Sequence, residues 1–151
     1  MNVAMESPDQ PEVIQLIAAL DAYQASLYPP ESCYALDLNA LKQAHVLFAV
    51  ARDVQGRAVG CGAIVMGAEF GEVKRMYVHP QSRGRGVARR VLTLLEATAE
   101  ASACRVLMLE TGPRQPEALA FYASFGYARR PPFGAYRDDP LSVFMQKNLP
   151  T

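Results

Sequence analysis

The sequence has few of the residues that build metal or disulfide frameworks. Its 151 residues include three cysteines, Cys33, Cys61 and Cys104, and no two of them have C-x-x-C spacing. The two histidines, His45 and His79, lie far from any paired cysteine. This scatter argues against a structural zinc site, and we expect no metal. An odd number of unpaired cysteines favours reduced thiols, so we expect a cytoplasmic protein.

An excess of either charge and long apolar runs are also lacking. Fifteen basic residues balance fifteen acidic ones, whereas general nucleic-acid binders usually carry a basic excess. No apolar run approaches the ~20 residues of a membrane span. The first ten residues are polar, contain Glu6 and Asp9, and do not resemble a signal peptide. We therefore expect neither a nucleic-acid partner nor a membrane.

The apolar residues that are present predict one domain over residues 1–151. Half of all residues are hydrophobic, which is enough for a sizeable core. Their periodicity predicts helices at 11–28, 38–44, 87–102 and 116–125, and strands at 46–51, 58–66, 72–78, 106–111, 127–130 and 142–146. Pro11 suits a first helical turn, and Pro29-Pro30 ends that helix. This order indicates a mixed α/β fold with an antiparallel meander and at least one crossover.

The most informative segment is a basic, glycine-rich turn between the strand at 72–78 and the next helix. It reads Gln81-Ser82-Arg83-Gly84-Arg85-Gly86-Val87-Ala88. Unpaired N–H groups at the start of a helix, its partial positive charge and two arginines together attract phosphate. Glycine allows a positive φ and close approach of a ligand to the backbone. The segment predicts a site for a phosphate-bearing cofactor.

This segment resembles the acetyl-CoA pyrophosphate loop of the GNAT family of N-acetyltransferases, whose pattern is Gln/Arg-x-x-Gly-x-Gly/Ala. Farther along, Phe121-Tyr122 followed by Gly126-Tyr127 is similar to the family's late Phe-Tyr-x-x-x-Gly-Phe/Tyr element. The resemblance runs from about residue 44 to 149. It implies a mixed α/β (α+β) GNAT-like fold, in which about four helices flank a central, mostly antiparallel and splayed sheet of six to seven strands.

The resemblance also implies the cofactor, acetyl-CoA (coenzyme A), and where it binds. The pantetheine arm is expected between the strands at 72–78 and 106–111, and the pyrophosphate on the amides of 83–88. The cofactor-binding residues implied are Met76, Tyr77, Val78, Gln81, Arg83, Gly84, Arg85, Gly86, Val87 and Ala88.

Acyl transfer to an amine needs a base for the nucleophile and a proton for the departing thiolate. Tyr122 lies where the family's tyrosine serves the leaving sulfur, and Glu72 lies on the strand where some members keep a base. Glu110 and Glu69 are secondary candidates for the base. Strict alternation would put Glu72, Lys74, Met76 and Val78 on one face and Val73, Arg75 and Tyr77 on the other, unless a bulge intervenes.

A narrower resemblance, to a bacterial GNAT subgroup with a Tyr-Pro-x-Glu-Ser segment, involves residues 27–32 and the late aromatic segment 131–136. We expect these two proline-stiffened loops to wall the acceptor pocket. The residues proposed to bind the acceptor are Tyr28, Glu31, Ser32, Arg75 and Tyr136.

The function implied is acetyl transfer from acetyl-CoA to a primary amine of a small molecule, or to a protein amine, by direct nucleophilic attack. The acceptor remains open between a polyamine, an amino acid, an amino sugar, an antibiotic and a protein. A non-catalytic acyl-CoA sensor on the same fold is the main alternative, because the loop reports binding only. A phosphate-binding domain without CoA preference, or RNA contact through Arg-Gly-Arg-Gly, fits the pattern less well. Family members are often dimers, which makes a homodimer an expectation too.

Overall fold

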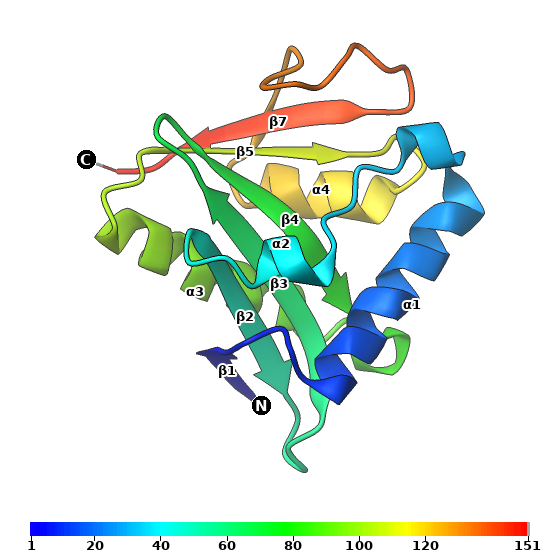
Figure 1. Cartoon of the computed structure of the whole chain (residues 1–151), viewed down its shortest axis with the longest axis vertical. Coiled ribbons are helices and arrows are strands. Elements are labelled where there is room, and N and C mark those ends of the chain that lie inside the picture. The colour runs from blue at the N-terminus through cyan, green and yellow to red at the C-terminus, as the bar shows by residue number, and fades with distance from the viewer. Residues whose placement is uncertain (151) are drawn as a thin grey trace.

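The computed structural model describes residues 1–150 and contains one seven-stranded sheet with helices on both faces (Figure 1). The strands, in the spatial order β1-β2-β3-β4-β5-β7-β6, are β1 (Asn2–Met5), β2 (Val46–Arg52), β3 (Ala58–Met66), β4 (Gly71–Val78), β5 (Val106–Thr111), β7 (Val143–Asn148) and β6 (Ala128–Arg130). The helices are α1 (Pro11–Leu27), α2 (Leu38–Leu41), α3 (Val87–Ala101) and α4 (Pro116–Ser124), with short 3₁₀ turns η1 (Pro30–Ser32) and η2 (Pro80–Ser82).

Two apolar clusters fix the helices to the two faces of the sheet. On one face α1 and α2 bury Val13, Leu16 and Leu41 against β2 and β3. On the other face α3 buries an apolar stripe that includes Val91 and Leu95, at the spacing of an amphipathic helix. Burying each such side chain contributes about 1.5–3 kcal/mol. The two clusters therefore hold helices on both faces of the sheet.

β4 and β5 are the parallel pair, and they stay paired over only three positions. Their register matches Gly71 with Leu107, and Val73 with Leu109, while the other five strand pairs are antiparallel. Beyond Val73 the two strands diverge, and the backbone of β4 loses its neighbour on this side. This confirms the predicted mostly antiparallel, splayed sheet.

A β-bulge interrupts β4 at the point of divergence. Cys61 pairs with Tyr77 and Ala63 with Lys74, so two β4 residues, Arg75 and Met76, lie opposite one β3 residue. Arg75 has a φ of 60°, which is rare for a residue with a side chain.

The strict alternation described for 72–78 in the absence of a bulge therefore holds only as far as Lys74. The extra residue in the bulge reverses the side-chain order. Met76 and Val78 pack with the α3 cluster, as Val73 does, whereas Tyr77 packs with the α1 cluster.

The predicted elements match the structure closely, with one omission. The strands at 58–66 and 106–111 have the predicted bounds, and the other predicted elements differ at their ends by up to three residues. The missed strand is β1, which pairs antiparallel with β2 from Asn2↔Arg52 to Met5↔Ala49. Only three of its four residues are apolar, Val3, Ala4 and Met5, and so short a run does not show the period of a strand; the pairing of its backbone with β2 reveals it.

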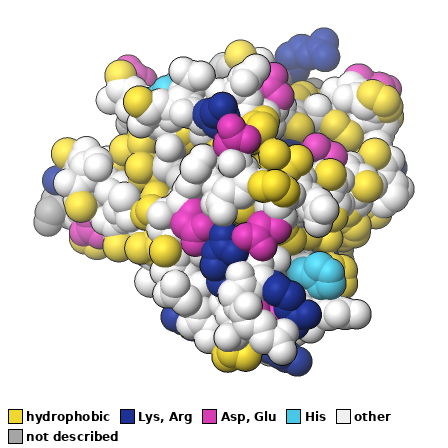
Figure 2. Space-filling model, turned by 60° about the horizontal axis from the view of Figure 1, so that its bottom comes forward, with side chains coloured by type: hydrophobic (Ala, Val, Ile, Leu, Met, Phe, Trp, Pro, Cys, Tyr) yellow, Lys and Arg dark blue, Asp and Glu magenta, His cyan; other side chains and the backbone are white. Residues whose placement is uncertain are grey.

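Charges of both signs are interspersed on the face shown in Figure 2. Arg52 of β2 forms ion pairs with Glu6 and Glu12. Within residues 1–150, no helix is both long and apolar enough to cross a bilayer. The same residues contain no group of three or more acidic, histidine or cysteine side chains placed to hold a metal ion.

Candidate active site

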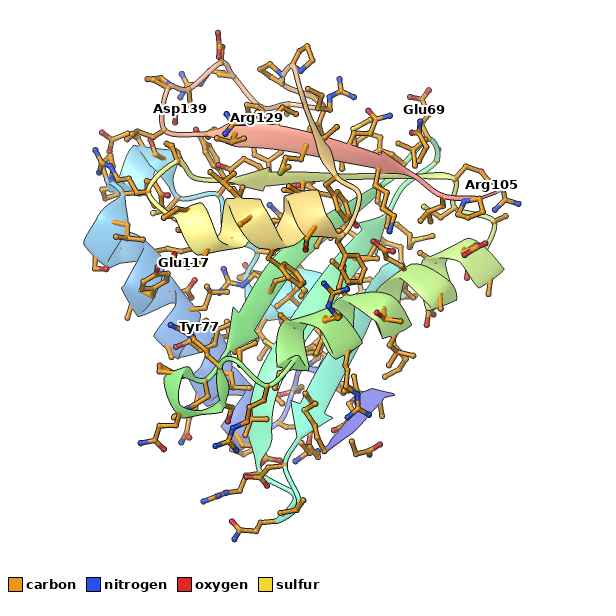
Figure 3. All side chains as sticks on the ribbon, turned by 180° about the vertical axis from the view of Figure 1, so that it is seen from behind. Glu69, Tyr77, Arg105, Glu117, Arg129 and Asp139 are labelled. Atoms are coloured by element: carbon orange, nitrogen blue, oxygen red, sulfur yellow. The ribbon has the colours of Figure 1, made fainter. Side chains whose placement is uncertain are left out.

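A groove of about 540 Å³ lies beside the end of β4, beyond the point where β4 and β5 stop pairing. We call it the cofactor groove. Its walls come from the end of β4, the glycine-rich loop, the first turn of α3, one side of α4, and Leu20 and Tyr23 of α1. Figure 3 labels two of the lining residues, Tyr77 at the end of β4 and Glu117 in the first turn of α4. Of the ten residues predicted to bind the cofactor, eight line the groove: Met76, Tyr77, Val78, Arg83, Gly84, Gly86, Val87 and Ala88.

The other two, Gln81 and Arg85, are exposed and lie outside the groove walls. The backbone N–H of Gln81 donates to Nδ1 of His79 at 3.2 Å, which stabilises the turn η2. This bond involves only the backbone of Gln81, so the cofactor-binding roles expected of Gln81 and Arg85 stay predictions.

The glycine-rich loop presents open backbone to the groove. Gly84 and Gly86 have φ values of 78° and 75°, and a Cβ at either position would meet no atom within 4 Å. Gly86 is the N-cap of α3 and provides no side-chain cap. The first N–H groups of α3 consequently lack partners within the helix and are available to an anion. These residues fit the pyrophosphate of a CoA cofactor.

Arg83 adds positive charge at the mouth of the groove. Its Nε donates to the carbonyl of Val78 at 3.0 Å. Its guanidinium lies 5.5 Å from the Tyr77 ring and 6.0 Å from the Tyr23 ring. Cation–π contacts of this kind hold an arginine in place without neutralising its charge. The guanidinium thus remains available to phosphate oxygens.

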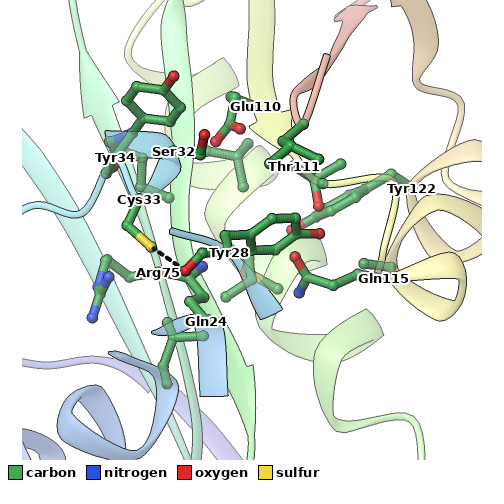
Figure 4. A pocket seen from close by; sticks show the side chains of 17 residues that line it. Gln24, Tyr28, Ser32, Cys33, Tyr34, Arg75, Glu110, Thr111, Gln115 and Tyr122 are labelled. Atoms are coloured by element: carbon green, nitrogen blue, oxygen red, sulfur yellow. Dashed lines mark hydrogen bonds between the residues drawn. The ribbon is translucent and has the colours of Figure 1, made fainter. Parts of the chain in front are cut away.

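A second, smaller pocket of about 90 Å³ adjoins the cofactor groove on the α1 side (Figure 4). We call it the acceptor pocket. Five residues line both spaces: Leu20, Met76, Gln115, Ala118 and Tyr122. The two spaces therefore meet at the side of α4 that carries Tyr122, where an acceptor and a thioester would come together.

Tyr122 is buried at this junction, with 8% of its surface exposed. Burial raises the pKa of its hydroxyl above the ordinary value, so the phenol stays protonated near neutral pH. Figure 4 shows Tyr122 together with Tyr28, Thr111 and Gln115, which line the same pocket. A protonated phenol at this position can donate a hydrogen bond or a proton to a leaving group.

Glu110, at the end of β5, is the one carboxylate among the described residues that line the acceptor pocket. Its Oε2 accepts a hydrogen bond from the Ser142 hydroxyl at 2.8 Å. Burial raises the pKa of Glu110 to about 7, although the Ser142 bond and the charge of Lys74 act in the opposite direction. A carboxyl group with this pKa can accept a proton at neutral pH and release it readily.

The structure gives Glu72 a different setting. Its carboxylate accepts a hydrogen bond from Tyr136 at 2.5 Å and lies 3.2 Å from Nζ of Lys74. Glu72 lines neither the cofactor groove nor the acceptor pocket; it borders a separate hollow beside the β3–β4 turn, as Glu69 does. Both carboxylates are thus separated from Tyr122.

Three of the five predicted acceptor residues line the acceptor pocket: Tyr28, Ser32 and Arg75. The Tyr28 hydroxyl accepts the backbone N–H of Arg114 at 3.1 Å and lies over Gly112, where a Cβ would come within 1.8 Å of it. The structure thus requires glycine at the end of β5.

The remaining two do not line the acceptor pocket. Glu31 is exposed on η1, and Tyr136 belongs to an aromatic cluster with Tyr34, Phe133 and Phe144. Sequence reasoning missed Gln24, Cys33, Thr111 and Gln115, which line the pocket. Thr111 and Gln115 lie on either side of Gly112-Pro113, where the predicted strand at 106–111 ends. Because the sheet was expected to open beside this strand, their position could have identified them as pocket residues.

Comparisons with known proteins agree with this geometry. Residues 14–127 match the model of the Acetyltransferase (GNAT) family. The chain is 48% identical over 151 residues to an "IAA acetyltransferase" of Azospirillum brasilense, covering 99% of this chain and 98% of that protein.

Solved structures give the same fold. A crystal structure of a candidate acyl-CoA N-acyltransferase from Klebsiella pneumoniae superposes with a TM-score of 0.84 at 43% identity, covering 98% of this chain and 97% of the other. PaiA N-acetyltransferase of Thermoplasma acidophilum, solved with coenzyme A, gives a TM-score of 0.76 at 17% identity, covering 99% of this chain and 100% of the other. The chain belongs to the GNAT family and is an acetyl-CoA-dependent N-acetyltransferase.

Proposed function

We propose that the enzyme acetylates the primary amine of a small molecule, with Glu110 as the base and Tyr122 as the proton donor to the leaving thiolate. One observation carries the proposal: the acceptor pocket has a single carboxylate on its wall and joins the cofactor groove at Tyr122. Its volume, about 90 Å³ against about 540 Å³ for the groove, suits the amine end of a small molecule better than a folded protein surface.

The balance of charge supports an amine acceptor. Two cationic residues line the acceptor pocket, but Arg75 is paired with Asp21 at 2.6 Å and Lys74 with Glu72 at 3.2 Å. Glu110 has no ion-pair partner among residues 1–150 and is held only by Ser142. An ionised Glu110 would therefore attract an ammonium group into the pocket.

The same residues supply the proton transfers. When bound, acetyl-CoA supplies the thioester whose C–S bond breaks as the acceptor nitrogen forms the new C–N bond. Glu110 accepts one proton from the bound ammonium group, which gives the neutral amine that attacks, and solvent takes the second proton that the nitrogen loses after the attack. The Tyr122 hydroxyl donates a proton to the departing sulfur. Solvent exchange returns both groups to their starting states. We assign the base to Glu110 in preference to Glu72, because Tyr136 and Lys74 already engage the Glu72 carboxylate.

The test is release of free CoA thiol from acetyl-CoA with a panel of amines, and mass spectrometry of the products. The panel contains polyamines, amino acids, amino sugars, aminoglycosides and a lysine peptide. It also contains IAA, the compound in the name of the Azospirillum brasilense relative. Acetylation of a small amine supports the proposal, and exclusive acetylation of the peptide contradicts it.

Glu110→Gln and Glu72→Gln then distinguish the two carboxylates. We expect kcat/KM to fall by about 10²-fold or more in Glu110→Gln, as for loss of a general base, and by less than about tenfold in Glu72→Gln. The reverse order of effects would transfer the role of base to Glu72.

We further propose that residues 1–151 act as one domain, as a homodimer, in the cytoplasm of a bacterium. Cys33, Cys61 and Cys104 are all free thiols, which suits a reducing compartment. Two relatives with more than 40% identity, from Azospirillum brasilense and Klebsiella pneumoniae, are bacterial proteins. Light scattering of the purified enzyme tests the dimer, and limited proteolysis tests the single domain.

A further inference from the structure

The segment 131–142 between β6 and β7 reaches across to η1 through Asp139. Oδ2 of Asp139 accepts hydrogen bonds from the Ser32 hydroxyl at 2.8 Å and the Tyr34 hydroxyl at 2.7 Å. Figure 3 shows Asp139 in this loop, beyond the end of the sheet that faces η1. Both hydroxyls come from residues more than a hundred positions away that line the acceptor pocket. Asp139 thus joins the wall formed by Ser32 and Tyr34 to its own loop, which contributes Leu141 to the pocket.

The same aspartate shapes the turn that leads to Glu110. Its Oδ1 accepts the backbone N–H of Leu141 at 2.8 Å, and its carbonyl accepts the N–H of Ser142 at 2.9 Å. The Ser142 hydroxyl then donates to Oε2 of Glu110 at 2.8 Å. A continuous chain of hydrogen bonds therefore runs from η1 to the proposed base.

We propose that Ser32, Tyr34, Asp139 and Ser142 form a clasp that closes the acceptor pocket and holds the Glu110 carboxylate toward it. Asp139 and Ser142 are positioning residues in this device, since they act through Glu110 and through the pocket walls. The inference about Ser142 rests on the proposed role of Glu110 as the base.

The clasp is not needed to keep the loop on the protein. Phe133, in the same loop, is buried and packs edge-on against Phe70, Phe144 and Tyr136, with ring centroids 5.1–5.8 Å apart. Tyr136 also donates to Glu72. These contacts hold the loop against the sheet without Asp139 or Ser142. The hydrogen bonds of Asp139 and Ser142 can therefore act on the shape of the acceptor pocket.

The charge state of Glu110 depends on groups from several elements. The charged groups that face it are Lys74 and Glu72 of β4 and Asp139 of the loop; the titratable neighbours are Tyr28, Cys33, Tyr34 and Tyr136. Ser142 supplies the direct hydrogen bond to the carboxylate. Because such a bond favours the charged form, its loss should raise the pKa of Glu110.

Ser142→Ala tests this step, with Ser142→Thr as the conservative variant and Ser26→Ala as a matched control. Ser26 is an exposed serine of α1 whose hydroxyl donates only to the nearby carbonyl of Tyr23. The primary measurement is the pH titration of the Glu110 carboxyl by ¹³C NMR. We expect an upward shift of about one pH unit in Ser142→Ala, little shift in Ser142→Thr and none in Ser26→Ala.

The acid limb of the kcat/KM profile should move by the same amount as the titration. An unchanged Glu110 titration in Ser142→Ala would overturn the clasp. Failure of the proposed function has a different signature: Glu110→Gln would then keep its activity, whatever the titration shows.

Asp139→Ala tests the closure of the pocket, with the exposed neighbour Asp138→Ala as control. We expect the KM for the acceptor to rise by about tenfold, because one or two hydrogen bonds that shape the pocket are lost. The KM for acetyl-CoA should stay within about twofold of the wild-type value. Asp139→Asn keeps an oxygen acceptor and should recover part of the loss.

An unchanged acceptor KM, or an equal rise in both KM values, would overturn the proposal. If Asp139→Ala does not fold, the double variant Ser32→Ala/Tyr34→Phe removes the same two bonds from the other side of the clasp. The same rise in the KM for the acceptor alone is then expected.

Discussion

Arg75 of the β4 bulge and Asp21 of α1 form an ion pair in which Nη2 lies 2.6 Å from Oδ1. The Arg75 side chain is 3% exposed, and its Nη2 also donates to the Ile17 carbonyl at 3.3 Å. A left-handed conformation costs a residue with a side chain about 1–2 kcal/mol. The pair with α1 therefore stabilises the conformation that turns Met76 toward the cofactor groove.

Replacing Asp21 should destabilise the fold and weaken cofactor binding together. In Asp21→Ala, a buried guanidinium would lose its counter-charge, and its Nε already lacks a hydrogen-bond partner among residues 1–150. Because Asp21 is half exposed, water replaces part of the interaction, and we expect a loss of about 2 kcal/mol in the free energy of unfolding. Urea unfolding measures it.

Asp9→Ala is the matched control for this variant. Asp9 pairs with Lys42 at 3.0 Å, but both side chains are more than 40% exposed, so we expect a change below about 0.5 kcal/mol. Equal effects of the two substitutions would show that the Arg75 pair has no special role in the fold.

The glycines of the loop should separate cofactor binding from stability. Gly84 and Gly86 share their backbone conformation with Gly56 of the β2–β3 turn, where φ is 81° and a Cβ would also meet no atom within 4 Å. Valine should cost about 1–2 kcal/mol of stability at each of the three positions, because the backbone strain is the same.

Only Gly84→Val and Gly86→Val place the new side chain against the cofactor groove. We expect these two variants to lose acetyl-CoA binding, measured by calorimetry or by the thermal shift that the ligand produces, while Gly56→Val keeps it. Wild-type affinity in both loop variants would falsify the assignment of the phosphate site.

Tyr122→Phe should reduce kcat while leaving the affinity for acetyl-CoA nearly unchanged. The substitution removes only the hydroxyl of a side chain whose ring packs against Phe121 and Tyr127. Loss of a proton donor to the leaving group should lower kcat by about 10²-fold. Steady-state kinetics with a saturating acceptor and calorimetry with acetyl-CoA measure the two quantities, and full turnover would remove Tyr122 from this role.

The sequence was sufficient to predict most of the fold because its signals are local. Pro11, Pro29-Pro30 and the loop glycines mark the ends of elements directly, and the predicted strands at 58–66 and 106–111 have their observed bounds. The bulge at Arg75 could not be predicted, since it depends on the pairing of β4 with β3 and on the contact with Asp21. The same bulge reversed the faces assigned to Met76 and Tyr77.

The proposed site was harder to predict because its walls come from distant segments. Tyr122 and the loop glycines could be identified from short motifs. Glu110 could not be preferred to Glu72 from sequence, because the choice depends on partners far along the chain. The Tyr136 hydroxyl donates a hydrogen bond to Glu72, which lies outside the acceptor pocket. The Ser142 hydroxyl donates a hydrogen bond to Glu110, which lines that pocket.

Glu110→Gln should change activity and stability in opposite directions. The pKa of Glu110 rises from its ordinary value of 4.5 to about 7, chiefly through burial, so the folded protein favours the protonated carboxyl. Its contribution to stability is therefore largest at low pH and decreases as the pH rises from 4.5 to 7. At pH 8 the wild type holds a partly buried carboxylate, and a neutral glutamine avoids the cost of its desolvation.

We therefore expect Glu110→Gln to be more stable than the wild type by about 1–2 kcal/mol at pH 8, and equally stable at pH 4. Turnover at pH 8 should meanwhile fall by about 10²-fold or more, since the base is missing. Thermal unfolding at the two pH values, together with initial rates, measures both effects. Glu69→Gln, an exposed carboxylate beside the β3–β4 turn, is the matched control and should change neither. A stability difference that did not depend on pH would show that the pKa of Glu110 is the same in the folded and unfolded protein. A different group would then have to cause any fall in kcat/KM on the acid side near pH 7.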